Sequence, residues 1–90
     1  LIHGGAGVEA GMSEQEQESY KKELCQALLK AHTAWKSGAA AVDVAAAAIC
    51  YLEDCPLFNA GRGAVFSYDG KNELDAAIMD GKSREAGSVA

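Results

Sequence analysis

The sequence has little positive charge, and this scarcity limits what the protein can bind. Eight lysines and arginines stand against thirteen aspartates and glutamates, which gives a net charge of -5. Without a basic patch, nucleic acid and anionic lipid are poor candidates for a main partner. The chain also lacks an apolar stretch long enough to cross a bilayer and lacks a signal-peptide pattern. We therefore expect a cytoplasmic protein that works without nucleic acid or a membrane.

Paired cysteines are missing as well. The three cysteines, Cys25, Cys50 and Cys55, are odd in number, and no two of them form a C-x-x-C motif. This pattern argues against a disulfide framework and favours the cytosol. A cysteine nucleophile is one interpretation. The simpler one is that Cys25 and Cys50 are small apolar residues within helices.

The length excludes more than one small domain. A chain of ninety residues buries only about 60–65% of its unfolded surface, so its core is marginal. Leu1 and Ile2 begin inside an apolar run, and residues 88–90 stop inside another. We therefore expect residues 1–90 to be a single partial domain, a fragment of a larger fold.

A first helix is predicted after residue 12. Ser13 followed by Glu16 is a capping box, and Lys36 with Gly38 marks the helix end. The apolar residues of this segment fall on one side at helical spacing, namely Tyr20, Leu24, Ala27, Leu28, Ala31 and Trp35. This stripe predicts that one face of the helix is buried.

A second helix is predicted over residues 41–54. Ala40 stands where a capping side chain would help, so the start is poorly capped, and Pro56 stops the helix. Apolar residues repeat at spacings of three and four, at Val42, Ala45, Ile49 and Leu52. The many alanines of this segment allow close contact with a neighbouring element.

Shorter segments around the helices have the pattern of strands. Strands are predicted at 1–3, 63–68, 73–79 and 87–89, and a loop at 8–12. Asp69-Gly70 marks a hairpin tip, and Asp80-Gly81 begins the next turn. The order is a strand, two helices and an antiparallel meander. It predicts an α+β fold with helices on one face of a sheet.

The motif HGGAG, residues 3–7, has several interpretations. Gly5, Gly7 and Ala10 match the spacing of a dinucleotide fingerprint, but the next helix begins too late and the required acidic residue is missing. An oxyanion loop of the esterase type would need a G-x-S-x-G elbow, which does not occur in these ninety residues. That interpretation and a tight structural turn both stay open.

Two other segments contain candidate functional residues. Asp75 and Asp80 flank an apolar run, as either a carboxylate pair or, more simply, solvated strand ends. The segment DCPLFNAGRGAVF, residues 54–66, is unusual because a connector between a helix and a strand is ordinarily polar. It instead carries Leu57 and Phe58 directly before Asn59.

Taken together, the motifs resemble a known family. HGGAG, GAAAVDVAAAAICYLED, CPLFNAGRGAVF, ELDAAIMDGK and AGSVA follow one another in one order. The chain resembles the N-terminal part of the α subunit of the plant-type L-asparaginases, also called isoaspartyl peptidases. The resemblance covers essentially all ninety residues, and LFNAGRG and DAAIMDG are its most specific parts.

The resemblance implies a fold and an activity. Members of this family are N-terminal nucleophile hydrolases with a four-layer αββα sandwich, and their precursor cleaves itself into α and β subunits. The new N-terminal threonine of the β subunit attacks the side-chain amide of L-asparagine or the isopeptide bond of β-aspartyl dipeptides. A paired (αβ)2 assembly is expected. The single threonine of this sequence, Thr33, lies in mid-helix, so the nucleophile must come from outside these residues.

The resemblance also implies a site in the segment after the second helix. There a structural sodium ion is held by backbone carbonyls, which suit a hard cation, and no organic cofactor is expected. By position, these are the carbonyls of Leu52, Glu53, Cys55, Phe58, Ala60 and Arg62. Apolar side chains then point away from the ion, although Leu57 and Phe58 can equally be core residues. Asn59 would lie near the nucleophile, and His3, Gly4 and Gly5 near the autocleavage site.

Two alternatives remain open within this interpretation. The chain can belong to a threonine aspartase, a related protease that shares HGGAG and the NAG block. It can also belong to a non-catalytic paralogue with a structural or binding role.

Overall fold

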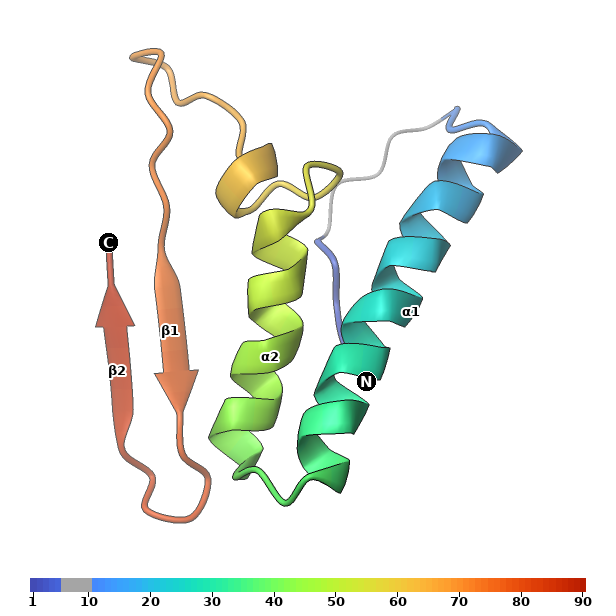
Figure 1. The fold of residues 1–90 in the computed structure, drawn as a ribbon. Coiled ribbons are helices and arrows are strands. Elements are labelled where there is room, and N and C mark those ends of the chain that lie inside the picture. Colours follow the sequence, from blue (N-terminus) through green and yellow to red (C-terminus); the bar gives the residue numbers. More distant parts are fainter. Residues whose placement is uncertain (6–10) are drawn as a thin grey trace.

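A computed structural model of the chain describes residues 1–5 and 11–90, and it places two helices beside a β hairpin (Figure 1). The helices are α1, Glu14–Lys36, and α2, Ala41–Asp54. A short 3-10 helix, η1, covers Gly61–Gly63. The strands β1, Ala76–Met79, and β2, Ala86–Val89, pair in antiparallel fashion.

The start of α1 is stabilised by the predicted capping box. The Ser13 hydroxyl accepts from the Glu16 amide at 3.3 Å, and the Glu16 carboxylate accepts from the Ser13 amide at 2.8 Å. The Ser13 side chain and backbone thus hold the pKa of Glu16 below its ordinary value. Gly38, with φ of 86°, follows the last turn. The first helix is therefore confirmed at both ends.

The second helix is also confirmed. Its bounds, Ala41–Asp54, match the predicted range, and Ala40 provides no side-chain cap. The helix ends where Cys55 takes an extended conformation, directly before Pro56. The four residues that join the helices let α2 run back along α1 (Figure 1).

The buried core lies between the helices at one end of α2. It consists of Ala27, Leu52, Cys55 and Phe58, and Ile2, Tyr20, Leu24 and Tyr51 pack around it. Ala27 is fully buried, because a methyl side chain lets α2 and the segment after it approach α1 closely. The predicted apolar stripe of α1 is only partly correct. Leu28 and Trp35 are exposed, at 44% and 62%.

The hairpin formed by β1 and β2 is closed by a turn built on Asp80. Ala76 pairs with Val89, and Met79 with Ala86. The Asp80 carboxylate accepts from the amides of Lys82 and Ser83, both at 3.1 Å, and from the Ser83 hydroxyl at 2.8 Å. These bonds, that of the Lys82 amide first, hold the pKa of Asp80 below its ordinary value.

Both strand predictions for this region are close to the structure. The strand expected at 73–79 is shorter, because only Ala76–Met79 has a partner in the described residues. The strand expected at 87–89 begins one residue earlier. Asp75 and Asp80 lie at opposite ends of β1, about 16 Å apart for five extended residues, so they do not form a carboxylate pair.

The strand predicted at 63–68 is wrong. Gly63 belongs to η1, and the residues after it pair with no strand in the described part of the chain. Asparagine side chains bind their main-chain groups instead. The Val65 amide donates to Asn59 Oδ1 at 3.0 Å, and Asn72 Nδ2 donates to the carbonyls of Ala64, at 2.8 Å, and Val65, at 3.3 Å.

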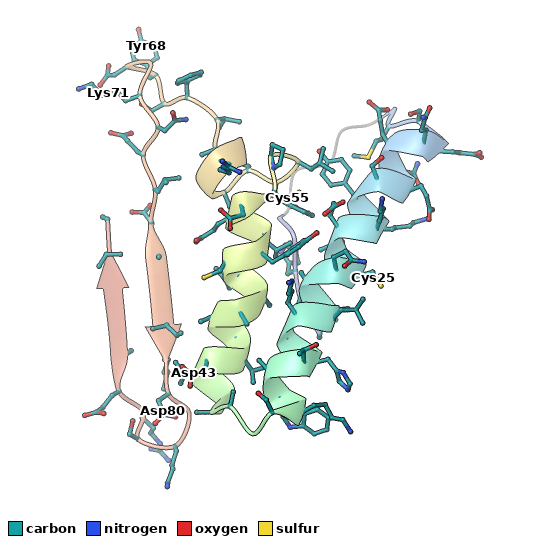
Figure 2. The ribbon with its side chains drawn as sticks, viewed as in Figure 1. Cys25, Asp43, Cys55, Tyr68, Lys71 and Asp80 are labelled. Atoms are coloured by element: carbon teal, nitrogen blue, oxygen red, sulfur yellow. The ribbon has the colours of Figure 1, made fainter. Side chains whose placement is uncertain are left out.

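The tip at Asp69-Gly70 does form. The amide of Ser67 donates to the Lys71 carbonyl at 2.7 Å, and Gly70 has φ of 72°. The turn is therefore confirmed, although it does not connect two strands. Figure 2 shows Tyr68 and Lys71 at this tip.

The first residues form no strand in the described structure, so the prediction for 1–3 is also wrong. Ile2 instead packs against the core cluster, whereas Leu1 is exposed. The predicted loop at 8–12 lies outside the described residues except for Gly11 and Met12. No helix among the described residues is long and apolar enough to cross a membrane.

Candidate functional site

The loop Cys55–Gly63 winds tightly after α2. Five main-chain hydrogen bonds hold it. Their donor amides and acceptor carbonyls are Cys55 to Leu52 at 3.2 Å, Phe58 to Cys55 at 3.4 Å, Ala60 to Phe58 at 2.8 Å, Gly63 to Ala60 at 3.0 Å and Ala64 to Gly61 at 3.2 Å. Four of the six carbonyls named in the sequence analysis thus accept bonds from the loop itself. A carbonyl oxygen has two lone pairs, so each retains capacity for a second partner.

The glycines of the loop permit this winding. A Cβ on Gly63 would collide with the main-chain oxygens of Phe58 and Pro56, and a Cβ on Gly61 with that of Glu53. Gly61 also has φ of 49°, in the left-handed region. Carbonyl oxygens from three points of the chain therefore face the glycine backbone.

The two apolar residues before Asn59 differ. Phe58 is 5% exposed, and its ring meets that of Tyr20 edge to face, with centroids 5.6 Å apart. Leu57 is 38% exposed. The core interpretation is therefore correct for Phe58 and wrong for Leu57, which lies on the outside of the loop.

The start of the chain lies under this loop. A Cβ on Gly4 would stand 2.8 Å from Phe58 Cε1 and 3.1 Å from a methyl group of Leu24. His3 Nδ1 accepts from the Gly5 amide at 3.1 Å, which fixes a bend, and Gly5 has φ of 120°. The predicted active-site segments, the first glycines and the loop, are thus adjacent. Ala6 and Gly7 of HGGAG lie outside the described residues, as does Ala10.

Asn59 connects the middle of the loop to the segment that follows it. Because the Val65 amide can only donate, the atom that accepts from it must be Oδ1, and the bond is 3.0 Å long. The amide nitrogen of Asn59 therefore lies on the other branch of the side chain. The side chain is exposed and lines a cavity.

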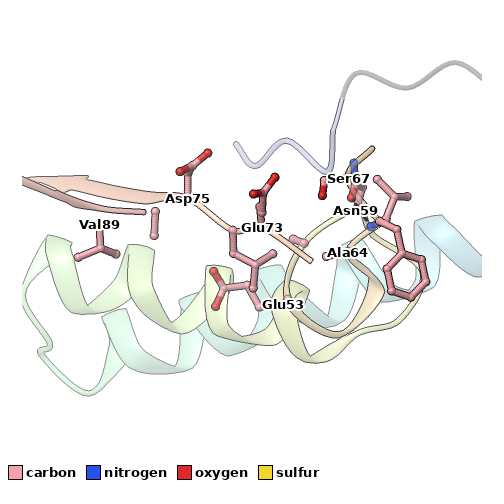
Figure 3. Close-up of a pocket in the computed structure, with 13 residues that line it drawn as sticks. Glu53, Asn59, Ala64, Ser67, Glu73, Asp75 and Val89 are labelled. Atoms are coloured by element: carbon pink, nitrogen blue, oxygen red, sulfur yellow. Dashed lines mark hydrogen bonds between the residues drawn. The ribbon is translucent and has the colours of Figure 1, made fainter. Parts of the chain in front are cut away.

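The cavity has a volume of about 580 Å³ and lies between the loop and the start of β1 (Figure 3). Asn59, Ala64 and Ser67 lie toward one end, and Asp75 and Val89 toward the other. The carboxylates of Glu53, Glu73 and Asp75 line it too. Its wall is therefore acidic, and a neutral amide is placed at one end.

Two polar residues of this region were not predicted from the sequence. The Ser67 hydroxyl is buried and has no hydrogen-bond partner among the described residues. A buried hydroxyl is costly unless it is paired, so Ser67 is a candidate for contact with a group that enters the cavity. Asn72 holds the segment that leads to Ser67. In the sequence, the one indication of a structural role for Asn72 was its position two residues after the Asp69-Gly70 turn.

One hydrogen bond joins the helices beside the loop. The Tyr51 hydroxyl donates to the Glu23 carboxylate at 2.5 Å, and both side chains are half-buried. This bond, together with burial and the negative charge of Glu23, raises the pKa of Tyr51 to about 12. The bond was not predicted, since 28 residues separate its partners.

The cysteines and the threonine form no nucleophilic centre in the described structure. Cys25 and Cys50 are exposed helical residues, and Cys55 is a core residue at the start of the loop. Figure 2 shows Cys25 on the side of α1 that faces away from α2. Thr33 lies within α1 and donates its hydroxyl to the Leu29 carbonyl at 2.8 Å, so it has no free terminal amine.

Two helices beside an antiparallel hairpin are compatible with a fragment of an N-terminal nucleophile hydrolase. The family follows from the sequence itself. The model of the family described as Asparaginase matches residues 1–90, and the chain belongs to that family. The resemblance inferred from the motifs is thereby confirmed.

Curated relatives cover the same span. The isoaspartyl peptidase of Salmonella typhimurium is 45% identical over 91 residues, which cover 99% of this chain and 29% of that protein. The plant-type L-asparaginase of Pyrobaculum calidifontis is 44% identical, over 100% of this chain and 29% of its own length. The isoaspartyl peptidase/L-asparaginase of Rattus norvegicus is 38% identical, over 99% and 26%. The chain thus spans less than a third of each relative.

Proposed function

We propose that this chain is the first part of the α subunit of a cytoplasmic amidohydrolase that cleaves L-asparagine and β-aspartyl dipeptides. The observation that carries the proposal is the relation to isoaspartyl peptidases and plant-type L-asparaginases along the full chain, at 38–45% identity in the three relatives above. The described residues contain no complete catalytic centre. Residues outside the chain must complete it.

In the complete protein, the chain would contribute a helical layer and part of one sheet of an αββα sandwich. The nucleophile would be a threonine freed by autocatalytic cleavage, at the start of a β subunit that pairs with this α subunit in an (αβ)2 assembly. Its terminal amine serves as the base that activates its hydroxyl. Catalysis thus requires a new chain terminus, which Thr33 cannot provide.

Asn59 would supply a neutral hydrogen-bond donor near that threonine. Its Oδ1 closes the loop on Val65, which leaves Nδ2 available to a group in the cavity. An amide donor orients a hydroxyl or stabilises an oxyanion without changing its own charge. The nearby carboxylates give the donor a second use, because a developing negative charge at this wall needs a compensating N–H group.

We also propose that a structural sodium ion binds at this loop. The proposal is supported by the main-chain oxygens of Glu53 and Phe58, which lie close to the backbone of Gly61 and Gly63, because carbonyls are suitable donors for a hard cation. The ligands would be the carbonyls of Leu52, Glu53, Cys55, Phe58, Ala60 and Arg62. No group of three histidine, cysteine or acidic side chains in the described residues could hold a metal. Such an ion would hold the loop in shape and take no part in the chemical step.

The test uses the protein encoded by the complete gene. We expect two chains on a denaturing gel, an N-terminal threonine on the second, and release of ammonia from L-asparagine or leucine from β-aspartyl-leucine. Replacement of that threonine by alanine should leave one uncleaved, inactive chain. An intact wild-type chain without hydrolysis would identify the non-catalytic paralogue instead. Cleavage of a protein loop, with neither small substrate hydrolysed, would identify the threonine aspartase.

A further inference from the structure

The hydrogen bond between Glu23 and Tyr51 lies where α2 passes into the Cys55–Gly63 loop. Tyr51 is in the last turn of α2, one residue before Leu52 and four before Cys55. Glu23 is on α1, which carries no part of the proposed ion site. The bond therefore connects the origin of the loop to a neighbouring helix.

A second contact attaches the loop to α1 farther along. The buried ring of Phe58 rests on Tyr20, one turn before Glu23. Apolar contact alone leaves the loop free to slide, because dispersion and burial have little directional preference. A short bond from a hydroxyl to a carboxylate is directional and strong for its class. Of these two contacts with α1, the Tyr51 bond is therefore the directional one, and it holds the end of α2 from which the loop departs.

Tyr51 packs against the core on one side, but the pair borders open space on another. An open hollow of about 340 Å³ lies beside it, lined by Glu23, Tyr51, Asp54, Cys55, Pro56 and Leu57. The first residues of the loop thus border open space on the side of the bond. Loss of the bond would let them move into that hollow.

We propose that Glu23 and Tyr51 are positioning residues that fix the Cys55–Gly63 loop on α1 and so place Asn59 for the proposed reaction. The inference rests on the proposed function for the role of Asn59, but the anchoring itself does not. It adds a residue on α1 to a site otherwise built from the first residues of the chain, α2 and the segments after it.

The alkylation rate of the Cys55 thiol measures, without an activity assay, how firmly the bond between Tyr51 and Glu23 holds the loop. This thiol is buried at the start of the loop, whereas that of Cys25 is exposed on α1. The experiment treats the folded full-length protein with iodoacetamide and follows each cysteine by peptide mass spectrometry. In Tyr51→Phe and in Glu23→Ala, alkylation of Cys55 should be about 2- to 10-fold faster than in wild type, the range expected for the loss of one hydrogen bond. Alkylation of Cys25 should not change.

Three further variants separate the bond from a general loosening. Glu23→Gln keeps an oxygen that accepts from Tyr51, so its Cys55 rate should return toward wild type. Glu18→Ala removes an exposed carboxylate of the same helix that lies 3.9 Å from Lys21, and it should change nothing. The double variant Tyr51→Phe/Glu23→Ala should match the single ones, since they break one interaction.

Equal Cys55 rates in wild type, Tyr51→Phe and Glu23→Ala would overturn the proposal. Faster alkylation with unchanged kcat and KM for β-aspartyl-leucine would overturn the link to Asn59, because the loop would then move without consequence. A lower kcat together with faster alkylation would support it. If wild-type full-length protein hydrolyses nothing, the proposed function fails, while the alkylation rates still decide whether the bond anchors the loop.

Discussion

The helical part of the molecule and its hairpin differ in how far they bury their apolar residues. In α1, α2 and the loop, Ala27, Leu52 and Phe58 are at most 5% exposed. In β1 and β2 every residue is exposed, and Ile78, Met79 and Val89 are 44%, 57% and 71% exposed. Both parts come from the same short chain, and only one has a core.

The difference follows from geometry. Two antiparallel helices can cover part of each other's apolar stripes, as α1 and α2 do around Ala27 and Leu52. A two-stranded sheet has two faces and two edges, and one neighbouring helix cannot cover them. Even the face toward α2 is incompletely sealed, because a cavity of about 480 Å³, lined by Ala45, Ile49, Ile78 and Val89 among others, separates them. The hairpin therefore leaves its apolar side chains exposed in the described structure.

The largest expected effect is on the isolated chain. We expect the ninety residues alone to show no cooperative thermal transition, since the core is small and the hairpin has none. Any residual protection from hydrogen exchange should lie in α1 and α2. Near-ultraviolet circular dichroism should be weak, because Trp35 is 62% exposed. A sharp transition with a strong tryptophan signal would remove the contrast between the two parts.

A second prediction compares a glycine from each part. In full-length protein, Gly63→Ala should destabilise by about 1–3 kcal/mol, because the new methyl group meets the main-chain oxygens of Phe58 and Pro56. Gly81→Ala, in the turn after β1, should be close to neutral, since nothing lies within 4 Å of its Cβ. Thermal denaturation measures both. Equal losses would show that the loop is no more tightly built than the hairpin turn.

A third and smaller effect concerns acid. The pKa of Asp80 in the folded state lies below its ordinary value, so its contribution to stability is present above that value and lost as pH falls through the folded pKa. Asp80→Asn, which cannot titrate, should be less stable than wild type at pH 6. This gap in melting temperature should narrow below about pH 4. A gap that stays constant down to pH 3 would rule out the carboxylate as the element that holds the turn.

The smallest expected effect belongs to the proposed ion site. Arg62→Ala keeps the main-chain carbonyl of residue 62, in η1, and removes only an exposed side chain. Sodium should therefore stabilise this variant and wild type equally. The measurement is the rise in melting temperature with sodium chloride over that with choline chloride. Loss of the sodium effect in Arg62→Ala would contradict a site made of main-chain oxygens.

The helices could be predicted from the sequence because their signals are local. Ser13 with Glu16 sets the start of α1, and Pro56 limits α2, so both ranges are correct. The 63–68 strand failed because its backbone partners are the side chains of Asn59 and Asn72, six or more residues away from the groups they bind. A strand-like sequence pattern does not show that side chains will take the main-chain hydrogen bonds that a neighbouring strand would otherwise make.

The candidate site was predictable in part. Its residues were implied by the resemblance to the family, and the structure shows that the segments of Gly4 and Phe58 are adjacent. Tyr51 and Glu23 could not be found, since each alone is an ordinary helical residue and only the crossing of two helices joins them. The same holds for Ser67, whose buried hydroxyl is a product of the fold.

The measurement that tests the central claim most directly is self-cleavage and turnover of full-length Asn59→Asp. Aspartate keeps an oxygen for the Val65 amide, so the loop can still close, but it replaces the proposed donor by a negative charge. We expect a folded protein whose cleavage or turnover is slower by about 10²–10³, the cost of losing one such donor. Asn59→Ala, which loses both contacts, should also lower the melting temperature. Wild-type rates for both steps in folded Asn59→Asp would contradict the account and leave Asn59 as a loop-closing residue only.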